Sequence, residues 1–253
     1  MKMRKLFIIT LIAAMLAFTG CASQPVSENK GEATVADTTA AATVEDDDSD
    51  VAVATVAGDE DDNEVEFDEK EVTSNLKVTP YNYSTEFGGH YLVLVIENKS
   101  QLDCELECSV DFYNKKDKIV GTESDSIDAF AAGTTACMTF NCDDKFKKYE
   151  YSFTAEELDY YDTVTKDLKC EVTTAKDKAI VSVKNNGKKI AQYVKANALF
   201  FKNDKLVYEN DAYVDDKNSE IKPGKTEKEE ISCYEKFDSV KVYLDAQAEM
   251  EED

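Results

Sequence analysis

The chain has 253 residues, enough for one or two domains, and its 53 acidic and 29 basic residues give a formal net charge of −24. This excess of carboxylates argues against nucleic-acid binding, because phosphates need Lys or Arg to neutralise them. Arg4 is the only arginine, so a bidentate guanidinium clamp on phosphate or carboxylate is excluded after that position.

The first 20 residues are predicted to be a lipoprotein signal peptide. A basic segment precedes an apolar run at 6–17, which is shorter than the roughly 20 residues of a membrane-spanning helix. Residues 16–21 then resemble a bacterial lipobox, with Phe18 where Leu is more common. The resemblance implies cleavage before Cys21 and a diacylglycerol on its thiol, which would hold the protein at the extracytoplasmic face of the cell membrane. An ordinary signal peptide or a membrane helix containing a cysteine is the alternative.

Residues 21–72 are predicted to form a disordered acidic tether. Between 22 and 72 there are 17 acidic and 2 basic residues, and the mutual repulsion of such charges opposes a packed core. Clustered carboxylates raise the alternative of a calcium loop. An EF-hand loop that starts at Asp59 would need glycine at its sixth position, where this chain has Glu64. We therefore expect a solvated spacer without a metal site.

From residue 73 onward, β-branched and aromatic runs alternate with Asn, Asp, Gly and Lys turns. This pattern is typical of an all-β sandwich. A capping-box spacing predicts one helical turn around 155–160, and the acidic segment 247–253 is expected to fray. The runs expected to form strands are 91–96, 104–113, 119–120, 137–142 and 149–153.

This part of the chain contains an internal repeat. Residues 96–99 align with 183–186, and residues 112–120 align with 199–207. Both alignments have an offset of 87 residues. A fixed offset between separate segments indicates two copies of one structural unit.

The repeat also predicts the domain boundaries. Residues 140–155 align with 231–246 at an offset of 91, which places four extra residues of the second copy near 215–222. The copies are expected at 73–160 and 161–253, each of about the size of an immunoglobulin-like β-sandwich. The sequence therefore predicts two tandem sandwiches that follow the leader and the tether.

Each copy contains a pattern in which an apolar residue and a spacer precede Leu-Tyr-Asp. In the first copy, residues 110–114 fill these places, and in the second copy Asn197 stands first and 199–201 fill the last three. Over about 75–250 the chain thereby resembles the FxLYD-type domains of Gram-positive lipoproteins. The resemblance implies an immunoglobulin-like sandwich and a location in the cell envelope. It supplies no catalytic residues, because a reaction does not define this family.

Cysteine usage leaves two alternatives open. Without Cys21 six cysteines remain, and an even number in an exported protein favours disulfides. The expected pairs are Cys108 with Cys142 and Cys170 with Cys233. Buried reduced thiols are the other alternative.

A zinc site formed by four cysteines is not expected. Cys104 and Cys108 are four residues apart and share one face of a strand, whereas Cys137 and Cys142 are five apart and lie on opposite faces. Four thiolates on such strands do not converge as tetrahedral zinc requires.

Catalytic and ligand-binding side chains are sparse. His90 is the only histidine, and a hydrolase would need a histidine base beside its nucleophile, so we expect a loop residue instead. Several tyrosines offer a flat face and a polar tip for a carbohydrate or peptide, although tyrosine is also common in strands. These tyrosines are Tyr160, Tyr161, Tyr193, Tyr208, Tyr213 and Tyr234.

The sequence therefore predicts a lipid-anchored extracytoplasmic module that binds or acts as a spacer through contact with a protein or with the cell wall. We expect no catalysis, no cofactor and no nucleic-acid partner. Its expected partners are the membrane, through the lipid on Cys21, and an unidentified envelope protein or the wall. The alternative is an accessory subunit of a membrane transport or secretion complex.

Overall fold

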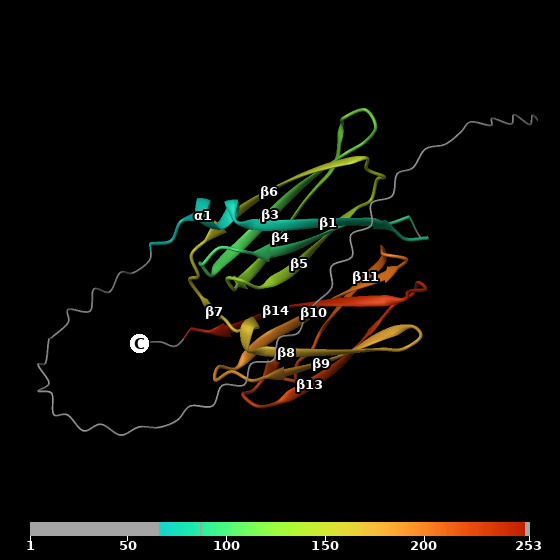
Figure 1. Ribbon diagram of the computed structural model, residues 1–253. Coiled ribbons are helices and arrows are strands. Elements are labelled where there is room, and N and C mark those ends of the chain that lie inside the picture. Colours follow the sequence, from blue (N-terminus) through green and yellow to red (C-terminus); the bar gives the residue numbers. More distant parts are fainter. Residues whose placement is uncertain (1–65, 87, 251–253) are drawn as a thin grey trace, which may run out of the picture. The chain divides into compact units, whose positions relative to one another are not determined.

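The computed structural model describes residues 66–86 and 88–250, which are mostly antiparallel β-structure with one short α-helix (Figure 1). The all-β fold expected from the sequence is confirmed. The predicted leader, Cys21 and the tether as far as residue 65 lie outside the described residues. In the described ranges, no helix is long and apolar enough to cross a bilayer.

The first sandwich consists of two three-stranded sheets with the orders β1-β2-β5 and β4-β3-β6. This arrangement corresponds to six strands of an immunoglobulin-like sandwich. Inward side chains alternate with outward ones, so apolar residues of both sheets meet in one core. The strands are β1 (Leu76–Ser84), β2 (His90–Asn98), β3 (Cys104–Tyr113), β4 (Ile119–Phe130), β5 (Thr135–Cys142) and β6 (Lys148–Glu156).

The second sandwich repeats this strand order. Its sheets are β8-β9-β13 and β11-β10-β14-β7, and the short β12 pairs with β10. A 3-10 helix, η1 (Thr165–Asp167), precedes β8. The strands are β7 (Tyr161–Thr163), β8 (Leu168–Thr174), β9 (Lys178–Asn185), β10 (Ala191–Lys202), β11 (Lys205–Tyr213), β12 (Glu220–Ile221), β13 (Thr226–Ser232) and β14 (Ser239–Glu249).

Each sandwich has its own hydrophobic core with an equivalent pair of phenylalanines. The rings of Phe112 and Phe146 have centroids 4.7 Å apart, and those of Phe200 and Phe237 are 4.9 Å apart. Phe112 and Phe200 are fully buried. Each such ring contributes about 1.5–3 kcal/mol of transfer free energy.

Two fully buried asparagines, Asn98 and Asn185, occupy equivalent turns at the predicted offset of 87 residues. The backbone oxygen of Asn98 accepts a hydrogen bond from Gly133 N (2.7 Å), and that of Asn185 accepts one from Gly224 N (2.8 Å). Each side-chain amide donates to the carbonyl four residues later. The two glycines are 91 residues apart, so both predicted offsets occur in the structure.

One part of the predicted alignment is wrong by one residue. Phe200, and not Leu199, occupies the place of Phe112 in the core, whereas Leu199 lies on the opposite face of β10. The reason is a β-bulge between Gln192 and Lys195, which adds one residue to β10. A shift of one residue moves every following side chain to the other face of a strand.

The same shift places Ala198, and not Asn197, at the first position of the Leu-Tyr-Asp pattern, because Ala198 lies in the second core. The four-residue insertion lies where the sequence places it, near 215–222. It contains β12, which pairs with the beginning of β10.

The first sandwich begins earlier than predicted, because helix α1 (Glu69–Ser74) spans the boundary placed at residue 73. Asp68 caps this helix by accepting hydrogen bonds from Lys70 N (2.9 Å) and Glu71 N (3.2 Å). Val72 is fully buried in the first core. The last residues assigned to the tether therefore belong to the sandwich.

Two other local predictions are wrong because strand pairing extends farther than the sequence suggests. The helical turn expected at 155–160 is absent, since β6 continues to Glu156 and pairs with β3. The acidic end is paired up to Glu249, because Gln247 and Glu249 of β14 face β7. Long-range pairing thus overrides the local capping and composition signals.

Candidate binding sites on the outer sheet faces

The two sandwiches contact each other through the outer faces of sheets β1-β2-β5 and β11-β10-β14-β7. Tyr81 packs edge-on against Phe201, with ring centroids 5.4 Å apart, and Tyr83 against Tyr208 at 6.2 Å. This aromatic cluster joins the sandwiches by burying apolar surface. Its buried members are Tyr83, Val93, Val95, Cys137, Leu199, Phe201 and Leu206.

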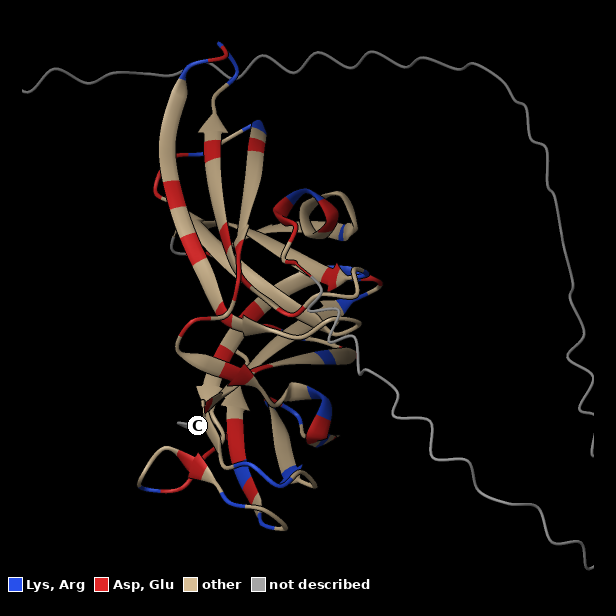
Figure 2. Ribbon diagram, turned by 90° about the vertical axis from the view of Figure 1, so that its left-hand side faces the viewer, with Lys and Arg blue, Asp and Glu red and all other residues tan. Residues whose placement is uncertain are grey.

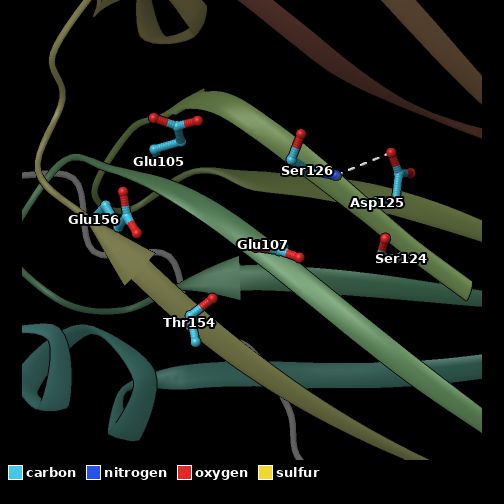
Figure 3. A pocket seen from close by; sticks show the side chains of 7 residues that line it. All are labelled: Glu105, Glu107, Ser124, Asp125, Ser126, Thr154 and Glu156. Carbon is cyan, nitrogen blue, oxygen red and sulfur yellow. Dashed lines mark hydrogen bonds between the residues drawn. The ribbon is translucent and has the colours of Figure 1, made fainter.

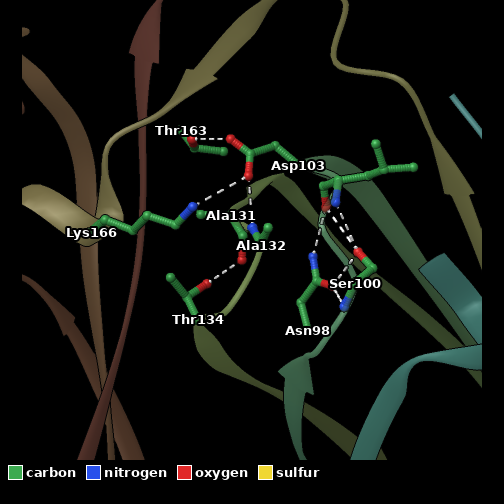
Figure 4. Close-up of polar contacts among 9 residues, drawn as sticks. Asn98, Ser100, Asp103, Ala131, Ala132, Thr134, Thr163 and Lys166 are labelled. Carbon is green, nitrogen blue, oxygen red and sulfur yellow. Dashed lines mark hydrogen bonds and ion pairs between the residues drawn. The ribbon is translucent and has the colours of Figure 1, made fainter. Parts of the chain in front are cut away.

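Asp103 provides a second, polar connection, where the chain passes from one sandwich to the other (Figure 4). Its carboxylate accepts hydrogen bonds from Ala132 N (2.7 Å) in the first sandwich and from Thr163 Oγ1 (2.6 Å) on β7. Lys166 Nζ lies 3.7 Å from the same carboxylate. Since both charged groups are at least one-third exposed, the two hydrogen bonds contribute more than the ion pair.

The outer face of sheet β4-β3-β6 has a hollow of about 390 Å³ (Figure 3). Acidic residues lie along the strands of sheet β4-β3-β6, and lysines are concentrated in the turns that adjoin its strands (Figure 2). Burial, together with the charges of Asp128, Glu156 and Asp159, raises the pKa of Glu105. The lining residues are Glu105, Glu107, Ser124, Asp125, Ser126, Thr154 and Glu156.

A second hollow, of about 310 Å³, lies on the outer face of sheet β11-β10-β14-β7. Asp128 of β4 contributes to it, so the second hollow has residues from both sandwiches. Three tyrosines surround it, whereas the first hollow has none. The lining residues are Asp128, Tyr161, Tyr193, Lys195, Tyr213, Asp245, Ala246 and Gln247.

The two hollows occupy equivalent places in the repeat. Glu107 is central in the first hollow and Lys195 in the second, and they are 88 residues apart, the same offset as between Phe112 and Phe200. Each central residue pairs directly with a lining residue on both neighbouring strands. These rows are Ser126, Glu107 and Thr154 in the first hollow and Tyr213, Lys195 and Asp245 in the second.

The second hollow and the adjoining interface contain carboxyl groups in an unfavourable environment for negative charge. Burial and the charge of Asp128 raise the pKa of Asp245 to about 6, although Lys195 partly offsets this. Burial and the charge of Asp211 raise the pKa of Glu209 to about 7. Lys195 therefore neutralises only part of the negative charge of these carboxyl groups.

The structure brings together three of the six tyrosines singled out in the sequence. Tyr161, Tyr193 and Tyr213 line the second hollow. Tyr208 instead packs beside Phe200 near the interface. The bulge that positions Tyr193 leaves no mark in the sequence, since a single inserted residue hardly changes the alternation pattern.

The predicted bridge between Cys108 and Cys142 is wrong. Cys142 lies at the level of Phe112 in the core. Its Sγ is next to Gly121, the strand partner of Phe112, and would lie 3.1 Å from a Cβ placed on that glycine. Cys108 is four residues from Phe112 along β3, roughly 13 Å at the rise of an extended strand. A disulfide requires Cα atoms about 4.4–6.8 Å apart, so the two thiols lie at different levels of the core.

The bridge between Cys170 and Cys233 is wrong for a similar reason. Cys170 pairs with Val183 of β9, whereas Cys233 N donates to the carbonyl of Asp177. Asp177 and Val183 are six residues apart along the chain, which is roughly 20 Å in an extended strand. Cys170 and Cys233 are therefore too far apart for a disulfide. All six cysteines of the described residues are free.

The cysteine side chains face the sides that strand alternation predicts. Cys104, Cys108 and Cys142 belong to the first core, and Cys137 belongs to the aromatic cluster on the other side of its sheet. Burial raises the pKa of Cys104 and of Cys108 to about 12, so both are unreactive thiols. Within residues 66–86 and 88–250, no group of three or more His, Cys, Asp or Glu side chains could hold a metal ion.

His90 lies at the exposed end of β2, where its Nδ1 is 2.6 Å from Ser84 Oγ. A catalytic pair would need a third group that orients the imidazole. In the part of the chain that the structure describes, His90 donates no hydrogen bond to a carboxylate. The contact therefore joins two paired strand ends, β1 and β2.

No protein-family model matches the chain, and no curated protein sequence matches it. Among solved structures, it is similar to the crystal structure of red sea bream transglutaminase, with 10% identity and a TM-score of 0.24. The match covers 68% of this chain and only 29% of that protein. A likeness at this level supports no inference about activity.

Proposed function

We propose that this protein is a lipid-anchored extracytoplasmic module that acts by contact with an envelope protein or the cell wall, without catalysis. The observation that carries the proposal is the recurrence of one hollow at equivalent places in both sandwiches. The two hollows keep their position on the sheet but differ in side chains, as expected of surfaces that recognise different chemical groups. The resemblance to FxLYD-type lipoproteins accords with this role.

The anchoring part of the proposal depends on Cys21. Full-length protein expressed in a Gram-positive host with a labelled fatty acid should carry the label and sediment with the membranes. Cys21→Ser should abolish both, because Cys21 is the cysteine directly after the predicted cleavage point. Cys104→Ser is the matched control and should retain both. Equal labelling of the wild type and Cys21→Ser would exclude the lipid anchor.

The contact part can be tested by a pull-down with the full-length protein from gently solubilised cells, beside sedimentation with purified cell wall. Sedimentation with the wall or enrichment of a soluble envelope protein supports the proposal. A stoichiometric membrane complex would instead support the accessory-subunit hypothesis. Glu107→Lys in the first hollow should weaken the contact, and Thr173→Lys on an exposed strand position elsewhere should not. A hydrolase activity abolished by His90→Ala would overturn the non-catalytic role.

A further inference from the structure

The second hollow exposes aromatic rings that the rest of the fold does not need for packing. Tyr193 is 53% exposed and Tyr213 is 54% exposed, so more than half of each side chain is accessible to a ligand. Tyr161 reaches the same hollow from β7. At about 310 Å³, the hollow is at the lower end of the size range of small-molecule sites.

The backbone around Tyr193 departs from the repeat in two ways, and both place this ring at the hollow. Tyr193 lies in the bulge of β10 and has φ 48°, a left-handed conformation that costs a non-glycine residue about 1–2 kcal/mol. Its N–H donates to the carbonyl of Ser219 (3.0 Å), which belongs to the four-residue insertion. In the first sandwich β3 pairs with β6 without a bulge, and the insertion has no counterpart there. The bulge and the insertion therefore support each other at this residue.

The charge of the second hollow is unbalanced. Asp128 and Asp245 line it, and the only cation in its lining is Lys195. The ammonium group of Lys195 lies 3.9 Å from a carboxylate oxygen of Asp211, which is outside the lining. Lys195 thus shares its charge with a third carboxylate, and the hollow retains an excess of negative charge.

We propose that the second hollow binds an organic ammonium group, whose charge faces Asp128 and Asp245 and whose alkyl groups pack on the rings of Tyr193 and Tyr213. Aromatic rings attract cations through their negative faces, and nearby carboxylates add to this attraction. This inference rests on the proposed contact function, because it names the ligand chemistry of one of the two hollows. A neutral sugar would leave both carboxylates without a counter-charge, so we expect the hollow to favour the ammonium group over a saccharide.

The test is calorimetric titration of the full-length protein in a maltoside detergent, which carries no ammonium group. Choline is the probe, and 3,3-dimethylbutan-1-ol is its neutral isostere. Choline should bind with a dissociation constant on the order of 1 mM, and the isostere about tenfold more weakly or not at all. N-acetylglucosamine, as the saccharide arm, should not bind. Equal affinity for choline and the isostere, or binding of the saccharide alone, would overturn the proposal.

Variants locate the binding. Tyr193→Ala, Tyr213→Ala and Asp245→Asn should each weaken choline about fivefold or more. Tyr234→Ala is the matched control, since Tyr234 is 81% exposed and lies outside the lining, and its affinity should equal that of the wild type. Tyr193→Gly relieves the left-handed backbone and removes the ring, so it separates lost binding from lost folding. Unchanged affinity in folded Tyr193→Gly and Asp245→Asn would refute the site.

The titration uses purified protein, so its result does not depend on anchoring or on a wall partner. If choline fails to bind while the pull-down succeeds, only the ligand assignment fails. If choline binds and neither wall nor envelope protein is recovered, the contact function fails while the ammonium site stands.

Discussion

The two sandwiches have the same strand order and equivalent cores, but their corresponding outer faces differ. The central row of the first hollow has two hydroxyl groups around Glu107, and that of the second has a tyrosine and an aspartate around Lys195. Core positions must be apolar and close-packed, whereas outward positions of the same strands are free to carry other chemistry. The fold thus fixes where each hollow lies, and the side chains decide what it can bind.

The strongest test of this comparison concerns the cores. Phe112→Ala and Phe200→Ala should each lower the free energy of unfolding by about 3–5 kcal/mol, because each leaves a cavity between two sheets. Denaturant titration followed by circular dichroism measures the loss. Tyr160→Ala, at a position that is 74% exposed, should change it by less than about 0.5 kcal/mol. A small effect of Phe200→Ala would contradict this assignment. It would instead support the alignment predicted from the sequence, in which Leu199 holds the core position.

The sequence predicts much of this fold because its signals are local or periodic. Alternation identifies strands such as β3, and the repeated turns at Asn98 and Asn185 set the first offset. The bulge at Tyr193 is not predictable in this way, since one inserted residue is masked by neighbouring aromatics that fit either register. Helix α1 is missed because the acidic composition of its surroundings outweighs its cap, Asp68, and its single buried residue, Val72.

The candidate sites are less predictable than the fold. The sequence identifies tyrosines that could contact a ligand but not which of them converge, because Tyr161, Tyr193 and Tyr213 come from three different strands. Asp128 is harder still to assign, since it reaches the second hollow from the other sandwich. Such groupings depend on the contact between sandwiches, which no short sequence pattern records.

The contact between sandwiches can be broken selectively. Leu199→Asp places a charge in the aromatic cluster, where Leu199 is fully buried, and should cost about 3 kcal/mol or more. Each sandwich retains its own core, so the variant should unfold in two transitions. Thr173→Asp, exposed on β8, is the control and should unfold like the wild type. One unchanged transition for Leu199→Asp would show that the cluster does not couple the sandwiches.

Stability should depend on pH through the carboxyl groups beside the interface. The folded-state pKa values of Glu209 (about 7) and Asp245 (about 6) exceed their ordinary values, so the folded state binds more protons than the unfolded state in this window. Stability should therefore fall as pH rises from about 5 to 8. The charged groups around these carboxyls are Asp125, Asp128, Lys195 and Asp211.

Thermal unfolding at pH 5 and pH 8 measures this dependence, and the melting temperature should be higher at pH 5. Glu209→Gln keeps the shape but removes the titration, so its melting temperature should rise at pH 8 and change little at pH 5. Glu171→Gln is the control, because Glu171 is exposed in an ion pair with Lys169. A wild-type melting temperature that rises with pH would contradict the environment assigned to Glu209.

The smallest expected effect concerns the cysteines. Because Cys108 and Cys142 lie at different levels of the first core, and Cys170 and Cys233 are separated along the second, reducing agent should leave the free energy of unfolding unchanged within about 0.5 kcal/mol. A structural disulfide would make a difference of about 2–5 kcal/mol. Thiol titration should show six reactive groups besides Cys21 after unfolding without reductant, and slow reaction of the buried thiols in the folded protein. If two thiols were missing, a disulfide would be present. A bridge between Cys108 and Cys142 would require one sheet to slide along its partner, and this movement would also misalign the core phenylalanines Phe112 and Phe146.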